Sequence, residues 1–187
     1  MPEAPIILRH ATAEDIPQIL ALIHALAAYE REPASTVQAT AESLRATLFP
    51  PPDATTTTTT TTPRRPPWAS VLLALTPTTL ETAGMALYFT SYSTWRSAPG
   101  IYLEDLFVYE RFRGQGFGTA LLAALAREVQ VIGGKRLEWS VLKWNEPSIK
   151  FYESLGAENM GNEWQLMRVT DEALTQLAGR GPAVKWE

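Results

Sequence analysis

The stretch that decides the fold reads Arg113-Gly114-Gln115-Gly116-Phe117-Gly118-Thr119. It follows an apolar run that is predicted to be a strand, and it leads into residues 116–132, where leucines recur at helical spacing. Alternate glycines allow a tight turn with inward-facing amides, and the helix N-terminus adds a partial positive charge. The Walker pattern and the dinucleotide fingerprint do not fit, because no Gly-Lys-Ser/Thr follows and no acid stands about 20 residues further on. The stretch therefore predicts a pyrophosphate-binding loop between a strand and a helix.

Strand-like and helix-like patterns alternate on both sides of this loop. We predict strands over 6–9, 68–75, 82–89, 101–108, 137–142 and 164–169, and helices over 12–29, 39–48, 116–132, 147–155 and near the C-terminus. This order indicates one α/β (α+β) domain over residues 1–187, with a mixed central sheet flanked by helices. Segment 49–67, with eight consecutive threonines from Thr55 to Thr62, is predicted to be a Pro/Thr-rich loop inserted into that domain.

The composition excludes several kinds of chemistry. The 187 residues are 45% hydrophobic and 19% charged, with a net charge of −4, no cysteine and two histidines. Disulfides, thiolate metal sites and cysteine nucleophiles are therefore excluded, and a metal site is not expected. Mild acidity argues against nucleic acid as a partner, since phosphate binding requires a basic face. Without an apolar leader or a long apolar run, we expect a cytoplasmic protein that does not bind membranes.

Two further groups of residues carry candidate chemistry. Glu104 and Asp105 lie within an apolar strand, where alternation places them on opposite faces, so at least one should face a polar cleft. Asn145 is predicted to cap the helix that begins at Glu146-Pro147. Ser148 and Tyr152 then project from the same face of that helix, which is either a ligand wall or a core face.

The strand 102–108, the loop 113–119 and the stretch 144–152 together resemble the acetyl-CoA site of the GNAT N-acetyltransferase superfamily. The strings Tyr102-Leu103-Glu104-Asp105 and Asn145-Glu146-Pro147-Ser148 are more specific, and with residues 26–30 and 89–95 they resemble the spermidine/spermine (diamine) N-acetyltransferase family. The likeness covers nearly the whole chain except 49–67. It implies a single GNAT domain, acetyl-CoA as the co-substrate, and a homodimer.

The resemblance also implies a role for each matching position. Coenzyme binding is assigned to Leu106, Phe107, Val108, Arg113, Gly114, Gln115, Gly116, Phe117, Gly118, Thr119, Asn145, Glu146, Pro147, Ser148 and Tyr152. The amine channel is assigned to Tyr29, Glu30, Glu104 and Asp105. Of these, Glu104 would accept the proton with Asp105 as its orienting neighbour, the Val108 amide would polarise the thioester carbonyl, and Tyr152 would protonate the leaving sulfur.

These residues predict direct acetyl transfer from acetyl-CoA to a primary amine of a polyamine or diamine. An alkyl ammonium group has a pKa of about 10.4, so a carboxylate must take its proton before the nitrogen attacks. The absence of cysteine excludes an acyl-cysteine intermediate. Two alternatives stay open: acetylation of a lysine-like amino acid such as thialysine, and a coenzyme-binding module without turnover.

Overall fold

The structure is a computed structural model that describes residues 5–50 and 67–180. Most of the predicted insertion 49–67 therefore lies outside the described residues. The chain divides into two compact units, Met1–Ser140 and Val141–Glu187. In the described part of the chain, no helix is long and apolar enough to cross a membrane.

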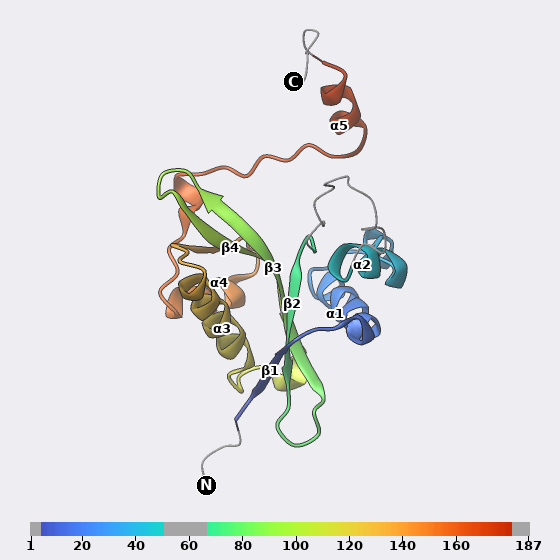
Figure 1. Cartoon of the computed structure of the whole chain (residues 1–187), viewed down its shortest axis with the longest axis vertical. Helices are drawn as coiled ribbons and strands as arrows, with labels where there is room; N and C mark the ends of the chain where they lie inside the picture. Colours follow the sequence, from blue (N-terminus) through green and yellow to red (C-terminus); the bar gives the residue numbers. More distant parts are fainter. Residues whose placement is uncertain (1–4, 51–66, 181–187) are drawn as a thin grey trace, which may run out of the picture. The chain divides into compact units, whose positions relative to one another are not determined.

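The first unit contains the expected mixed sheet (Figure 1). Its strands are β1 (Ile7–His10), β2 (Ser70–Leu75), β3 (Thr82–Ser93), β4 (Ala98–Val108) and β5 (Leu137–Trp139), in the spatial order β1-β2-β3-β4-β5. The first four strands are antiparallel neighbours, whereas β5 joins β4 in parallel. A parallel pair requires a crossover, which the helix after the glycine-rich loop supplies.

Helices cover both faces of this sheet. On one face lie α1 (Ile16–Tyr29) and α2 (Ala41–Leu48), and on the other lies α3 (Phe117–Val131), as Figure 1 shows. Short 3-10 turns precede α1 at Ala13–Asp15, follow it at Ala34–Thr36, and lie before the glycine-rich loop at Glu110–Phe112. The start of α2 is fixed by Thr40, whose hydroxyl accepts a hydrogen bond from the Ser43 amide at 3.1 Å.

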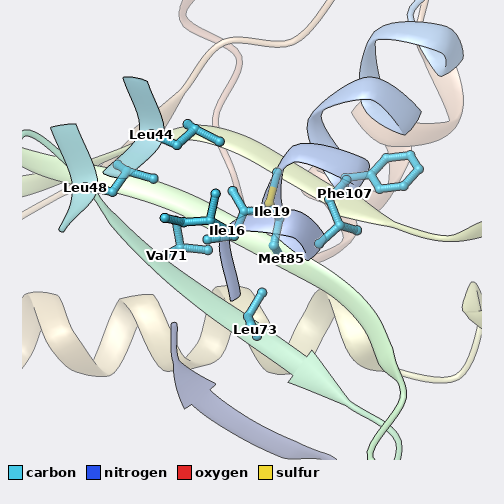
Figure 2. Close-up of a cluster of buried hydrophobic side chains, with 9 residues drawn as sticks. Ile16, Ile19, Leu44, Leu48, Val71, Leu73, Met85 and Phe107 are labelled. Carbon is cyan, nitrogen blue, oxygen red and sulfur yellow. The ribbon is translucent and has the colours of Figure 1, made fainter. Parts of the chain in front are cut away.

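The core lies between the sheet and the pair α1 and α2 (Figure 2). Its buried side chains are Ile16, Ile19, Leu22, Leu44, Leu48, Val71, Leu73, Met85 and Phe107. The members from α1 are three residues apart, which is the helical spacing that the sequence displays. Because Phe107 belongs to this core, the end of β4 is anchored against α1.

A β-bulge interrupts β4 in the middle of the predicted site. Leu87 of β3 pairs with Asp105, but the next residue, Tyr88, pairs with Leu103, so Glu104 is the extra residue of the bulge. The simple alternation from which we predicted opposite faces for Glu104 and Asp105 does not continue through it. After the bulge, Asp105 lies on the α1 face, because its partner Leu87 packs against the core on that face.

The second unit contains α4 (Glu146–Ser154), a 3-10 turn at Met160–Asn162 and α5 (Asp171–Ala178). The strand predicted over 164–169 is wrong: these residues pair with no strand of the described chain, and Met167 is 81% exposed. The apolar alternation is present there, but a strand also needs a neighbour whose backbone pairs with it. The strand predicted over 137–142 is real but ends at Trp139.

Candidate active site

The backbone edge of β4 is open beyond the point where β5 leaves it. On that side, β5 pairs with β4 only from Ile101 to Leu103. No other strand of the described residues pairs with β4 there. An open strand edge presents backbone donors and acceptors at regular spacing, and an extended ligand that contains amides can bind to them as an added strand.

The register decides which amides face this open edge. The Tyr109 N–H donates to the Ala83 carbonyl at 2.9 Å, and Val108 lies opposite Gly84. In an antiparallel pair, this pattern turns the backbone groups of Val108, and of Leu106 two residues earlier, away from β3. The Leu106 and Val108 amides therefore face the open edge, as their predicted coenzyme role requires.

Phe107 differs from Leu106 and Val108 because its backbone faces β3 and not the open edge. Its backbone is paired with Met85 of β3, and its side chain is buried in the core on the α1 face. Phe107 therefore has no backbone amide on the open edge. Its contribution to the predicted site is to anchor the strand that carries Leu106 and Val108.

Gly84 supports this edge from the opposite strand, and the sequence predictions missed it. A Cβ atom on Gly84 would lie 2.3 Å from the Phe107 carbonyl oxygen and 2.9 Å from a methyl group of Val108. Only glycine fits at such a close approach between backbones. The signal was available, because an isolated glycine inside a strand pattern is typical of close backbone contact.

The glycine-rich loop has the geometry that its sequence predicts. Gly114 and Gly116 adopt φ angles of 76° and 86°, the left-handed region that favours glycine. Gly116 is also the residue before α3, so the first-turn amides of this 15-residue helix follow it directly. Such amides have no partner within their own helix and attract anions. The loop backbone therefore fits a pyrophosphate group.

Several side chains of the loop are engaged within the protein. The Gln115 side-chain amide donates to the Arg111 carbonyl at 3.0 Å. The Phe117 side chain is buried, with its ring centre 5.8 Å from that of Phe112. Gly118 and Thr119 lie in the first turn of α3, where Thr119 is exposed. The predicted contact of Phe117 with a coenzyme would therefore be made through its backbone atoms, because its side chain is buried.

Arg113 turns its side chain toward α1. Its Nε–H donates to the Val108 carbonyl oxygen at 3.0 Å. Its guanidinium carbon lies 4.5 Å from the centre of the Tyr29 ring and 5.7 Å from that of Phe107. The first residue of the coenzyme loop is thus in contact with the predicted amine-binding wall.

Three carboxylates interact where α1 ends beside the β4 bulge. Asp105 is half-buried, and burial, followed by the nearby charges of Glu104 and Glu30, raises its pKa to about 6. The pKa of Glu30 is also raised, first by burial and then by Glu32. Glu104, the bulge residue, is exposed. A concentration of negative charge with this degree of burial attracts a cationic group such as an ammonium ion.

In the second unit, Asn145 begins α4 as predicted. Asn145 is 6% exposed, and its Oδ1 accepts a hydrogen bond from the Ser148 amide at 3.4 Å. Glu146 and Pro147 form the exposed first turn, where Glu146 pairs with Lys150 at 3.7 Å. Both predicted hydroxyl groups, those of Ser148 and Tyr152, belong to half-buried residues. They lie one helical turn apart on the same helix, so they share a face.

The structure thus gathers part of the predicted site in one compact unit. Tyr29, Glu30 and the residues from Glu104 to Thr119 belong to the first unit, whereas residues 145–148 and Tyr152 belong to the second. In residues 5–50 and 67–180, no group of three or more His, Cys, Asp or Glu side chains is arranged to hold a metal ion.

An open strand edge that leads into a glycine-rich helix N-terminus suits a ligand with a chain of amides and a pyrophosphate, which is the chemistry of coenzyme A-dependent acyltransferases. The model of the Acetyltransferase (GNAT) family matches residues 40–157, and the chain belongs to this family. The resemblance seen in the sequence is confirmed at this level. The chain is an acetyl-CoA-dependent N-acetyltransferase with a GNAT fold.

Individual relatives agree with this assignment. The chain is 34% identical over 196 residues to L-ornithine N5-acetyltransferase NATA1 of Arabidopsis thaliana, covering 89% of this chain and 85% of that protein. It is 32% identical over 177 residues to thialysine N-epsilon-acetyltransferase of Bos taurus, covering 94% and 98%. Among solved structures, an integron cassette protein from V. cholerae superposes with a TM-score of 0.71 at 21% identity, covering 94% of this chain and 98% of that one, which shows a shared fold.

Proposed function

We propose that this protein transfers acetyl from acetyl-CoA to a terminal primary amine of a diamine or polyamine. The observation that carries the proposal is a cluster of three carboxylates: Glu104 and Asp105 lie on β4, which carries the open edge, and Glu30, at the end of α1, is near enough to affect the pKa of Asp105. An amine substrate arrives as a cation at neutral pH, so this negative charge both attracts it and provides a proton acceptor.

In the proposed mechanism, acetyl-CoA supplies the acetyl group as a thioester. The chain's own residues position the reactants and move two protons. A carboxylate oxygen takes one proton from the substrate ammonium, and the neutral nitrogen then attacks the thioester carbonyl carbon. As the C–N bond forms and the C–S bond breaks, the Tyr152 hydroxyl gives its proton to the departing sulfur. The tyrosinate is reprotonated by the second proton that the nitrogen loses as it becomes an amide. The Val108 amide, on the open edge, donates to the carbonyl oxygen of the acetyl group. The sequence favoured Glu104 as the proton acceptor, but the half-buried position of Asp105 and its raised pKa favour Asp105.

The relatives support a second candidate substrate. Their names record acetylation of ornithine N5 and of thialysine Nε, which are side-chain amines of amino acids. A lysine-like amino acid also presents a cationic primary amine to the carboxylates. It differs from a polyamine by the carboxylate that it carries, which the negative charge of Glu30 would repel.

Initial-rate assays with a panel of amines test this proposal. We expect kcat/KM for spermidine, spermine or putrescine to exceed that for thialysine and ornithine by about 10-fold or more. Glu30→Gln should narrow this preference, because it removes a charge that favours polycations. Glu42→Gln, an exposed acid on α2, is the matched control and should leave the preference unchanged.

Two other outcomes of that assay contradict the proposal. A 10-fold preference for thialysine or ornithine would establish the second candidate instead. Calorimetric binding of coenzyme A without transfer to any amine would show a coenzyme-binding module that lacks turnover.

We also propose that the protein is a cytoplasmic homodimer. Residues 164–169 and helix α5 expose several large apolar side chains, including Trp164, Leu166, Leu174 and Leu177. Large apolar side chains that gather at the surface are typical of a protein interface. Light scattering coupled to size exclusion should give twice the chain mass of 20.7 kDa, and a monomer at micromolar concentration would contradict the proposal. Cell fractionation tests the location.

A further inference from the structure

Arg113 is assigned to the pyrophosphate loop by its place in the sequence, but its side chain contacts a different part of the protein. The guanidinium group lies over the Tyr29 ring at 4.5 Å, and the Nε–H donates to the Val108 carbonyl at 3.0 Å. A guanidinium stacked on an aromatic ring is held by cation–π attraction and by the contact of two planar groups. Arg113 therefore links three segments: the coenzyme loop, the end of β4 and the end of α1.

The hydrogen bond from Arg113 to Val108 holds the peptide group between Val108 and Tyr109. The carbonyl oxygen of this peptide accepts from Arg113, and its N–H, which belongs to Tyr109, donates to the Ala83 carbonyl at 2.9 Å. With both ends bonded, the peptide plane has one orientation. This peptide is joined to the Val108 amide through the Val108 Cα, so holding it restricts the backbone of Val108 on the open edge.

The contact with Tyr29 fixes the end of α1. Tyr29 is the last residue of this helix, and Glu30 follows it. The charge of Glu30 contributes to the raised pKa of Asp105, so the two carboxylates are close enough to interact. By holding Tyr29, Arg113 keeps the carboxylate of α1 in place relative to the carboxylate of β4.

Arg111, two residues earlier, shows a contrasting role for an arginine beside the same loop. Its guanidinium pairs with Glu81 at 2.6 Å and lies 4.8 Å from the ring centres of Tyr109 and Phe112. Among the described residues, the ion pair and ring contacts of the Arg111 guanidinium involve neither Tyr29 nor Val108. Arg111 is therefore a matched control of the same residue type.

We propose that Arg113 is a positioning residue that joins the coenzyme loop to the amine-binding end of α1, and that it does not act as a phosphate ligand. The proposal rests on the acetyltransferase function proposed above. It assigns recognition of the pyrophosphate to loop backbone and helix amides, and it assigns the Arg113 side chain to the alignment of the Val108 amide with the carboxylates.

Acyl donors with and without phosphates separate the two roles. Arg113→Met keeps the length of the side chain but removes its charge and donors. We expect it to lower kcat/KM by about 10-fold or more with acetyl-CoA and by the same factor, within about threefold, with acetyl-pantetheine, which has no phosphate. Arg113→Lys, which restores the cation over Tyr29, should recover part of the loss. Arg111→Met should retain wild-type kcat/KM with both donors.

A loss of kcat/KM in Arg113→Met that occurs with acetyl-CoA but not with acetyl-pantetheine would overturn the proposal. Such a result would show that the Arg113 side chain acts by binding phosphate. Calorimetry with coenzyme A gives a readout that does not need turnover: we expect the Kd of Arg113→Met within about threefold of wild type, and a 10-fold weaker Kd would also overturn the proposal. If Arg113→Met does not fold, the comparison of the two acyl donors and the Kd for coenzyme A are measured on Arg113→Lys instead.

A double-mutant cycle tests the contact itself. In a Tyr29→Leu background, Arg113→Met should cost less in kcat/KM than it does in wild type, since the ring is gone while the bond to the Val108 carbonyl remains. Equal losses in both backgrounds would contradict a role through Tyr29. Wild-type protein that acetylates no amine with either donor would refute the proposed function, whereas the coenzyme Kd of the Arg113 variants would still decide this inference.

Discussion

Replacing Asp105 with asparagine is expected to lower kcat/KM for the amine by about 100-fold or more, which is the contribution typical of a positioned general base. Asparagine has nearly the same shape but cannot accept the proton. Glu104→Gln is the matched comparison, because it removes the adjacent carboxylate from the exposed bulge position. We expect this second loss to stay below about 10-fold. A large loss in Glu104→Gln with an active Asp105→Asn would identify Glu104 as the acceptor.

The pH dependence provides a separate test of Asp105. Its pKa is raised to about 6, so the carboxylate is protonated and inactive as a base below that pH. Wild-type kcat/KM should therefore increase as the pH rises through about 6 and should then level off. In Asp105→Asn, this acidic limb should disappear from the residual activity. A wild-type limb centred near the ordinary carboxyl pKa of about 4 would contradict the assignment.

The raised pKa of Asp105 also predicts that Asp105→Asn is more stable than wild type at neutral pH. Because the folded-state pKa of Asp105 lies above its ordinary value of 3.8, folding favours the protonated form. This stabilisation is complete below the ordinary value and is lost as the pH rises through about 6. An uncharged asparagine avoids that loss, so we expect its melting temperature to exceed that of wild type by about 2–4 °C at pH 7.5. At pH 4 the two melting temperatures should converge.

Tyr152→Phe is expected to lower kcat by about 10- to 100-fold, with the KM for both substrates within about threefold of wild type. The substitution removes only the hydroxyl and keeps the ring, whose centre lies 5.4 Å from that of Phe151. A phenol can protonate the leaving thiolate, and its loss affects the step in which sulfur departs. Full activity in Tyr152→Phe would remove this role. The matched control is Tyr92→Phe, which removes the hydroxyl of an exposed tyrosine in β3 and should leave kcat at the wild-type value.

A change of leaving group sharpens this test. An acetyl thioester of an aromatic thiol releases a thiolate that is stable without protonation. With such a donor, the deficit of Tyr152→Phe relative to wild type should shrink to about threefold or less. An unchanged deficit would show that Tyr152 acts in binding or positioning and not as a proton donor.

The sequence predicted the parts of the fold and site that depend on local pattern. The glycine-rich loop and the helix after it were predicted correctly, since left-handed turns at Gly114 and Gly116 require glycine and the leucines of α3 follow helical spacing. The cap at Asn145 was found for the same reason, because capping depends on residues within one turn. In each case the determining contacts are local.

The parts that could not be predicted depend on pairing between distant segments. The bulge at Glu104 exists only in the register between β3 and β4, and it places Asp105 on the α1 face, which alternation along β4 alone could not predict. The stacking of Arg113 on Tyr29 joins residues more than 80 positions apart. Residues 164–169 failed as a strand because alternation cannot report whether a pairing partner is present. Periodicity in one segment contains none of this information.

The open edge of β4 has a consequence for experiments that survey this protein one substitution at a time. At Leu106 and Val108 the groups on the edge belong to the main chain, and every residue except proline carries the same N–H. Exchanging these side chains for others of similar size leaves the edge as it was. A catalogue of tolerated side chains would therefore rate these two positions as ordinary apolar sites, although the peptide bonds between them form the surface on which an acyl donor can lie.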